Sequence, residues 1–115
     1  MTKTVVYAPP AQADLGEIGD YFFESSDTLP DRFVDAVENT VEFLARVSET
    51  SQIGTRYESD DPACQNIRIC RVKGFTKDLI FYRIENSTLK ILRVLHAARD
   101  YRNIMENENL TQKEN

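Results

Sequence analysis

The sequence has few of the residues that build metal centres and covalent crosslinks: one histidine, His96, and two cysteines, Cys64 and Cys70, in 115 residues. The cysteines lie six positions apart, unlike the close pairs of zinc sites, and one histidine cannot complete a tetrahedral set. We therefore expect no metal and no cofactor. Two reduced thiols are typical of a cytosolic protein, with Cys70 buried in a strand and Cys64 in a loop.

Long apolar runs and phosphate-binding glycine loops are also missing. No segment approaches the roughly 20 apolar residues that span a bilayer, and the first ten residues, MTKTVVYAPP, are interrupted by prolines, unlike a signal peptide. We therefore expect a cytoplasmic protein with no membrane partner. No serine, threonine or cysteine has a recognisable activating partner, so the sequence chemistry alone disfavours an enzyme.

Positive charge is scarce in the first half of the chain. Residues 1–62 contain four lysines and arginines against thirteen aspartates and glutamates, a balance of −9, whereas residues 63–115 contain ten against six, a balance of +4. The net charge of −5 is unlike that of nucleic-acid-binding domains, whose basic balance supplies most of their non-specific affinity. We expect no sequence-specific nucleic-acid binding, and two surfaces of opposite sign.

The hydrophobic pattern predicts an α+β fold with the order β-α-α-β-β-β. Residues 4–9 predict a strand, residues 10–26 and 27–47 predict two helices that form a hairpin, and residues 48–66 predict a loop. Three further strands at 66–72, 78–84 and 88–96 predict an antiparallel meander on which the hairpin packs. We expect a single domain over residues 1–104 and a polar C-terminal tail over 105–115, and the segment from residue 97 onward to start a short helix or to be part of the tail.

Residue spacing predicts which side chains are buried. Residues at helical spacing predict a buried stripe on each helix. The stripe of the first helix consists of Ala11, Leu15, Ile18 and Phe22. The stripe of the second consists of Phe33, Val37, Thr40, Leu44 and Val47, and is widened by Val34, Val41 and Phe43. The acidic residues Asp14, Glu17, Asp20 and Glu24 are left for the solvent side of the first helix. Strict alternation in the last strand places Leu89, Ile91, Arg93 and Leu95 on one face, and Lys90, Leu92, Val94 and His96 on the other.

Both faces of the last two strands are then mostly apolar, whereas an open sheet face normally alternates with polar residues. This favours a partner-binding surface over a fully internal core. Three arginines, Arg83, Arg93 and Arg99, lie near His96 and could converge on an anion. We favour the alternative, in which they pair with acidic neighbours (Asp78, Glu85 or Asp100) or line a partner's groove.

His96 and Tyr101 are the candidates for chemistry in this region. An imidazole can act as a general acid or base near neutral pH. A lone histidine at a strand end is more often structural, and Tyr101 is a similar case. A docking role is therefore favoured over a catalytic one.

Several of these segments together resemble the ParE branch of the RelE/ParE toxins of bacterial toxin–antitoxin systems. The matching segments are YAPPAQADLGEIGDYF, IRICRVKGF, LIFYRI and ILRVLHAARD, with Gly54 in the connecting loop. The resemblance covers about residues 4–104. It implies a strand, a helical hairpin and an antiparallel sheet, the order that the hydrophobic pattern also predicts.

The resemblance further implies a toxin that binds DNA gyrase and traps the cleaved-DNA state, rather than an enzyme. A ParD-like antitoxin encoded beside it would hold it inactive, along the groove between hairpin and sheet. We expect Arg83, Arg93 and Arg99 to bind the antitoxin, and Arg99, Asp100, Tyr101 and Arg102 to contact gyrase.

Two alternatives stay open at this point. The RelE branch cuts mRNA on the ribosome, and this chemistry would use Arg93, His96 and Tyr101. Against it, Ala97 and Ala98 follow His96, where the nucleases tend to have basic residues. The chain could also be a non-toxic remnant that only binds its antitoxin.

Overall fold

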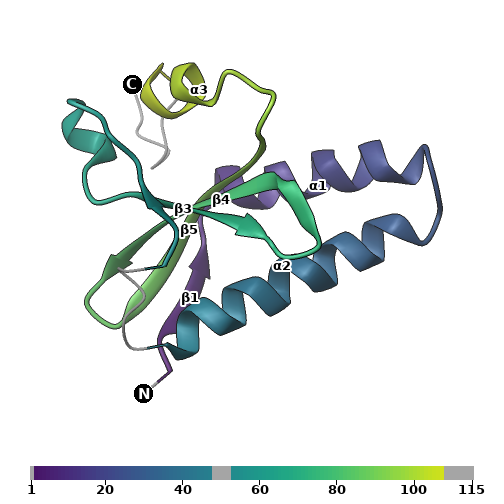
Figure 1. Ribbon diagram of the computed structural model, residues 1–115, viewed down its shortest axis with the longest axis horizontal. Helices are drawn as coiled ribbons and strands as arrows, with labels where there is room; N and C mark the ends of the chain where they lie inside the picture. The colour runs from purple at the N-terminus through teal and green to yellow at the C-terminus, as the bar shows by residue number, and fades with distance from the viewer. Residues whose placement is uncertain (1, 48–52, 108–115) are drawn as a thin grey trace.

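The computed structural model describes residues 2–47 and 53–107 (Figure 1). Its elements in chain order are β1 (Thr4–Tyr7), α1 (Pro9–Phe23), α2 (Leu29–Arg46), β2 (Thr55–Arg56), the 3-10 turn η2 (Pro62–Cys64), β3 (Arg68–Val72), β4 (Phe75–Glu85), β5 (Thr88–His96) and α3 (Tyr101–Asn107). The strands form one sheet in the order β1-β5-β4-β3-β2. The predicted α+β class and element order are confirmed, and β2, η2 and α3 complete them.

Local sequence explains where the helices begin and end. A proline in the first turn begins both α1 and α2, where the missing N–H costs nothing. In α2, Asp31 lies in the first turn and Arg46 in the last, and both charges complement the helix dipole. The two helices pack side by side as the predicted hairpin (Figure 1).

The meander β3-β4-β5 is antiparallel, as predicted. Two-residue turns join its strands, and Gly74 (φ 88°) and Asn86 (φ 57°) adopt the left-handed conformation that such turns favour. Strand β4 therefore begins at Phe75, three residues before the predicted start. Strand β1 pairs in parallel with β5, from Thr4 beside Thr88 to Tyr7 beside Ile91, and the chain between them contains the helical hairpin and strands β2, β3 and β4.

A bulge in β5 overturns the predicted alternation. Phe81 is opposite Arg93 and Tyr82 is opposite Ile91, which leaves Leu92 as the extra residue. Side chains after the bulge change face. Val94 therefore joins the core on the helix side and Leu95 the core on the opposite side, the reverse of the prediction.

The sheet has a core on each face. The first lies under α1 and α2, and the second is covered by α3 and by the segment from Tyr57 to Ile67. Figure 1 shows α3 and this segment on the side of the sheet away from the helical hairpin. The second apolar face is thus covered by the chain itself, and the prediction that it is a partner-binding surface is wrong.

Residues near the C-terminal end of the described chain contribute to that second core. Ile104 and Met105 are 5% and 2% exposed, so the expected boundary between domain and tail at residue 104 falls inside α3. Cys64, expected in an open loop, is buried in η2, and its Sγ donates a hydrogen bond to the carbonyl oxygen of Met105 (3.4 Å). Cys70 is half-buried in β3. No helix within the described ranges is long and apolar enough to cross a membrane.

Candidate functional site

Arg93 forms a buried ion pair with Asp14 of α1. Its Nε and Nη2 donate to the two carboxylate oxygens, each at 2.8 Å, and Asp14 and Arg93 are 3% and 8% exposed. The Val94 N–H donates to the same carboxylate at 2.9 Å. The prediction that Asp14 faces solvent is therefore wrong. Asp14 lies in the segment YAPPAQADLGEIGDYF that carries the family resemblance, and this was the one indication of a special role. Helical spacing alone predicts an exposed position for it.

Arg83 is also engaged within the chain. Its Nη2 donates to the carbonyl oxygen of Ala63 (2.7 Å), its Nε to that of Gln65 (3.2 Å), and its Nη1 pairs with Glu85 (3.3 Å). The predicted pairing with Glu85 is confirmed, and the carbonyl bonds hold η2 and the residue that follows it against β4. Arg83, Arg93 and Arg99 therefore do not converge on one anion, and Arg99 is the one of the three that is exposed.

The segment after β5 presents charged groups at the surface. Arg99, Asp100 and Arg102 are exposed, whereas Tyr101 is half-buried, with its ring 5.4 Å from the ring of Phe81. Arg102 is held by Glu106 (2.8 Å) and by the carbonyl oxygen of Glu58 (2.9 Å). The four predicted gyrase contacts thus share one short surface segment at the start of α3.

Tyr57 anchors α3 to the sheet. Its hydroxyl donates to Glu106 at 2.8 Å, and the guanidinium carbon of Arg102 lies 4.9 Å from the centre of its ring. Burial, followed by the hydrogen bond to Glu106, raises the pKa of Tyr57, so the phenol stays protonated at neutral pH. The same hydrogen bond lowers the pKa of Glu106.

His96 opens onto a hollow of about 330 Å³ between α1 and the ends of β4 and β5. The hollow is lined by Glu17, Ile18, Tyr21, Asp78, His96 and Arg99. Nδ1 of His96 accepts the N–H of Ala98 (3.0 Å), which fixes the ring. Opposite it in the ladder, Asp78 is 4% exposed, and burial raises its pKa, an effect that His96 partly offsets.

The three residues of the nuclease alternative occupy separate environments. Arg93 is paired with Asp14, His96 faces the hollow beside Asp78, and Tyr101 packs in the second core. Within residues 2–47 and 53–107, no group of three His, Cys, Asp or Glu side chains is placed to hold a metal ion.

A basic groove of about 700 Å³ separates α2 from β3. We call it the α2–β3 groove; its lining residues are Arg32, Asp35, Ala36, Asn39, Thr40, Phe43, Arg46, Cys70, Arg71 and Lys73. Four of these are cations and one is an acid, in a chain of net charge −5. Phe43, predicted to widen the buried stripe, is 46% exposed at its wall.

Thr40 connects the two walls of this groove. Its hydroxyl donates to the carbonyl oxygen of Ala36 (2.8 Å) and accepts the N–H of Lys73 (3.1 Å). No local pattern predicts that these cations meet in one groove, because Arg32 and Arg46 are far from Arg71 and Lys73 along the chain. The groove between hairpin and sheet that the resemblance implied is present, with walls from α2 and β3.

Comparisons with known proteins agree with this geometry. The family model for the ParE toxin of the type II toxin–antitoxin system parDE matches residues 5–101. A comparison with curated proteins gives no match. The match to the family model covers most of the chain, including α1, both walls of the groove and the start of α3.

Two solved structures have a similar fold. One is the chromosomal ParDE toxin–antitoxin system of P. aeruginosa, with a TM-score of 0.69 and 18% identity over 83% of this chain and 96% of that one. The other is the RelBE2 toxin–antitoxin complex of Mycobacterium tuberculosis, with a TM-score of 0.60 and 24% identity over 86% of this chain and 95% of that one. At these identities the likeness shows the shared fold, and the family model shows the branch: the chain belongs to the ParE toxin family of type II toxin–antitoxin systems.

Proposed function

We propose that this ParE-family toxin inhibits DNA gyrase by binding it and stabilising the cleaved-DNA state. The observation that supports a binding mechanism most directly is the Asp14–Arg93 ion pair. It occupies the arginine that a ribosome-dependent nuclease would need, whereas His96 faces the hollow beside Asp78 and Tyr101 packs against the second core. The family match to the parDE system supports the same branch.

The gyrase contact in this proposal is the surface segment at the start of α3. Arg99, Asp100 and Arg102 are exposed there, and the half-buried ring of Tyr101 lies between them. The bonds from Arg102 to Glu58 and Glu106 keep the segment ordered, which lowers the entropy cost of binding.

A ParD-like antitoxin neutralises the toxin in this proposal by occupying the α2–β3 groove. The four cations suit an acidic segment, and the exposed ring of Phe43 suits an apolar anchor. Strand β2 pairs with Arg68 and Ile69 only. Among the described residues, the rest of β3 has no strand on that side, so an extended antitoxin segment can add there.

The three arginines predicted to bind the antitoxin have different roles in this proposal. Arg99 is exposed and can pair directly with an acidic antitoxin residue. Arg83 and Arg93 support binding by holding η2 and the helix α1 in place. Direct contact by these two arginines would require their internal hydrogen bonds to break.

Two parallel assays on the purified toxin, freed of antitoxin, test the proposed function. One measures gyrase supercoiling with a readout for trapped cleaved DNA, and the other measures mRNA integrity during ribosomal translation. We expect trapped cleavage with intact mRNA, and loss of trapping in an Arg99→Glu variant. Cut mRNA with unaffected gyrase would establish the nuclease alternative, and no effect in either assay would indicate a non-toxic remnant.

A further inference from the structure

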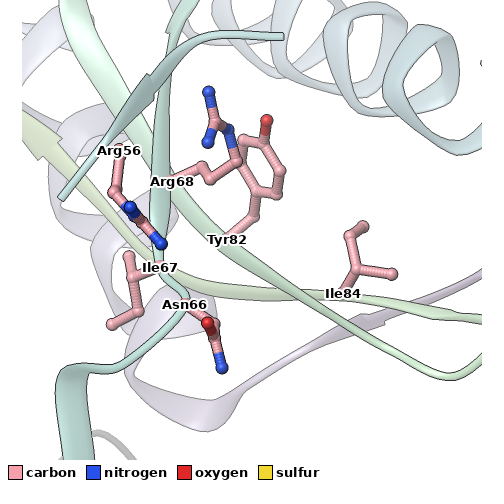
Figure 2. Close-up of a pocket in the computed structure, with 6 residues that line it drawn as sticks. All are labelled: Arg56, Asn66, Ile67, Arg68, Tyr82 and Ile84. Carbon is pink, nitrogen blue, oxygen red and sulfur yellow. The ribbon is translucent and has the colours of Figure 1, made fainter. Parts of the chain in front are cut away.

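A second, smaller hollow of about 200 Å³ lies over strands β2, β3 and β4 (Figure 2). It is lined by Arg56, Asn66, Ile67, Arg68, Tyr82 and Ile84. We call it the arginine hollow. Figure 2 shows its two arginines on adjacent strands to one side of Tyr82, with Ile84 on the other side.

The strand register sets two arginines against each other. Arg56 of β2 is the direct partner of Arg68 in β3, and Arg68 is the partner of Tyr82 in β4. Partners in a ladder project from the same face of a sheet, and like charges directly opposite are destabilising. The register thus sets two like-charged residues at neighbouring positions on one face, with no acidic side chain among the lining residues.

One of the two guanidinium groups is fixed. Arg68 donates from Nε to the carbonyl oxygen of Ile53 (3.0 Å) and from Nη2 to that of Gly54 (3.1 Å). The Tyr82 hydroxyl donates to the same Ile53 oxygen at 2.8 Å. Arg56, in contrast, is exposed. An anion bound here would meet Arg68, whose guanidinium is held in place, and Arg56, whose exposed side chain can adjust its position.

We propose that the arginine hollow binds a carboxylate of an acidic and apolar segment of the antitoxin, as an extension of the α2–β3 groove. The inference rests on the proposed function for the identity of the partner. Arg68 and Cys70 are two residues apart in β3 and therefore share a face, so the hollow and the groove are neighbours along one strand. A single extended segment can reach both.

The mixed lining and the net charge favour a protein carboxylate over a nucleic-acid phosphate. Ile84 gives the hollow an apolar wall, which suits the stem of a glutamate or an apolar neighbour in a peptide. The chain has a net charge of −5, because residues 1–62 carry −9 and residues 63–115 carry +4. This net negative charge would repel a polyanion. A short acidic segment presents its charge locally and avoids most of this repulsion.

Charge reversal at Arg56 separates binding from folding. In Arg56→Glu the like-charged pair with Arg68 becomes an opposite pair, so the fold should be as stable as the wild type or slightly more stable. The affinity for the antitoxin should nevertheless fall by about tenfold or more, because an acid now meets the carboxylate. Arg56→Lys keeps the charge but loses the bidentate geometry, and its affinity should fall less.

The experiment uses the full-length toxin and the purified protein encoded by the neighbouring reading frame, with binding followed by calorimetry. Lys77→Glu is the matched control, because it makes the same charge change at an exposed position in β4 outside both hollows and the groove. We expect Arg56→Glu to bind more weakly than Lys77→Glu, with a melting temperature at or above that of the wild type.

Each other outcome contradicts the inference in a distinct way. Equal affinities of Arg56→Glu and Lys77→Glu, with wild-type binding intact, would overturn the arginine hollow but leave the proposed function standing. Absence of binding by the wild type would overturn the proposed antitoxin partner and the hollow together. Binding of a short single-stranded RNA that Arg56→Glu abolishes would assign the hollow to phosphate and overturn the carboxylate assignment.

Discussion

Asp14 and Arg93 lie 79 residues apart in sequence and form a bidentate ion pair between α1 and β5, with both N–O distances at 2.8 Å. Strand β1 pairs with β5 only as far as Ile91, so the edge of β5 beyond that residue has no neighbouring strand within the described chain. The Asp14 carboxylate accepts the Val94 N–H at that edge. One side chain thereby fixes the helix, satisfies a strand edge and neutralises a buried cation.

Removal of either partner of this ion pair should destabilise the fold strongly. Asp14→Ala leaves Arg93 and the Val94 N–H buried without their acceptor, and we expect a loss of about 3–5 kcal/mol in the free energy of unfolding. Urea denaturation measures it. Asp20→Asn, which removes an exposed charge from the same helix, is the control, with an expected change within about 0.5 kcal/mol.

The double variant Asp14→Leu with Arg93→Met separates charge burial from the pair itself. An apolar pair of similar volume should recover most of the stability lost in Asp14→Ala, because no uncompensated charge remains. A double variant as unstable as Asp14→Ala would show that the Val94 hydrogen bond, rather than the buried arginine, dominates the cost.

Sequence periodicity was sufficient for the elements that bury one clear stripe. The strong apolar spacing of α2 and the short turns of the meander predicted the hairpin, the antiparallel meander and the α+β class. The parallel pairing of β1 with β5 was beyond such reasoning. It joins segments 84 residues apart, from Thr4 to Thr88, and no local pattern encodes it.

The candidate site was less predictable, because its residues depart from local rules. Helical spacing assigned Asp14 to solvent, although Arg93 compensates its burial from the far end of the chain. Strict alternation failed after Ile91 because a bulge is not visible in the sequence. The apolar alternation of the last two strands predicted an interface on the second face. Ile104 and Met105 of α3 cover this face instead.

Truncation of Phe43 should mainly lower the affinity for the antitoxin, whereas truncation of Met105 should mainly lower the stability of the fold. Phe43 is 46% exposed in the α2–β3 groove, so Phe43→Ala should change stability by less than about 1 kcal/mol. It should weaken antitoxin binding by about tenfold or more, as loss of an aromatic anchor does. Met105 is 2% exposed, so Met105→Ala should cost about 2–5 kcal/mol in stability.

Measuring unfolding and antitoxin affinity for both variants tests this contrast. Each variant serves as the control for the other, because both remove a large apolar side chain. A Phe43→Ala variant with wild-type affinity would contradict antitoxin docking in the α2–β3 groove.

Ionisation of Asp78 should make the fold less stable as the pH rises. Burial raises its pKa above the usual 3.8, so the folded chain binds this proton more tightly than the unfolded chain. The penalty is absent below 3.8 and develops as the pH rises through the folded-state pKa. Asp78→Asn should therefore gain stability over the wild type at about pH 8 and lose that advantage towards about pH 4.

Chemical denaturation of both proteins across this pH range measures the difference. The charged groups facing Asp78 are Glu17, His96 and Arg99, and His96 opposes the effect of burial. A His96→Gln variant, which lacks this opposing interaction, should therefore show a larger gain on Asp78→Asn substitution. An advantage of Asp78→Asn that does not vary with pH would contradict the assignment to ionisation.

The two cysteines provide a footprint of the antitoxin. Cys70 lines the α2–β3 groove and is half-buried, whereas Cys64 is 1% exposed beneath α3. Burial raises the pKa of both thiols, so alkylation at neutral pH should be slow for both and slower for Cys64. Addition of the antitoxin should protect Cys70 by about tenfold or more if it fills the groove, because access then requires dissociation.

Mass spectrometry of the alkylated peptides gives the two rates in one sample, and Cys64 then reports on opening of the fold alone. Equal protection of both cysteines would mean that the antitoxin stabilises the whole domain from elsewhere. Protection of Cys70 alone would locate the antitoxin in the groove. Loss of that protection in Phe43→Ala, with the Cys64 rate unchanged, would show that the exposed ring and the thiol are covered by the same bound segment.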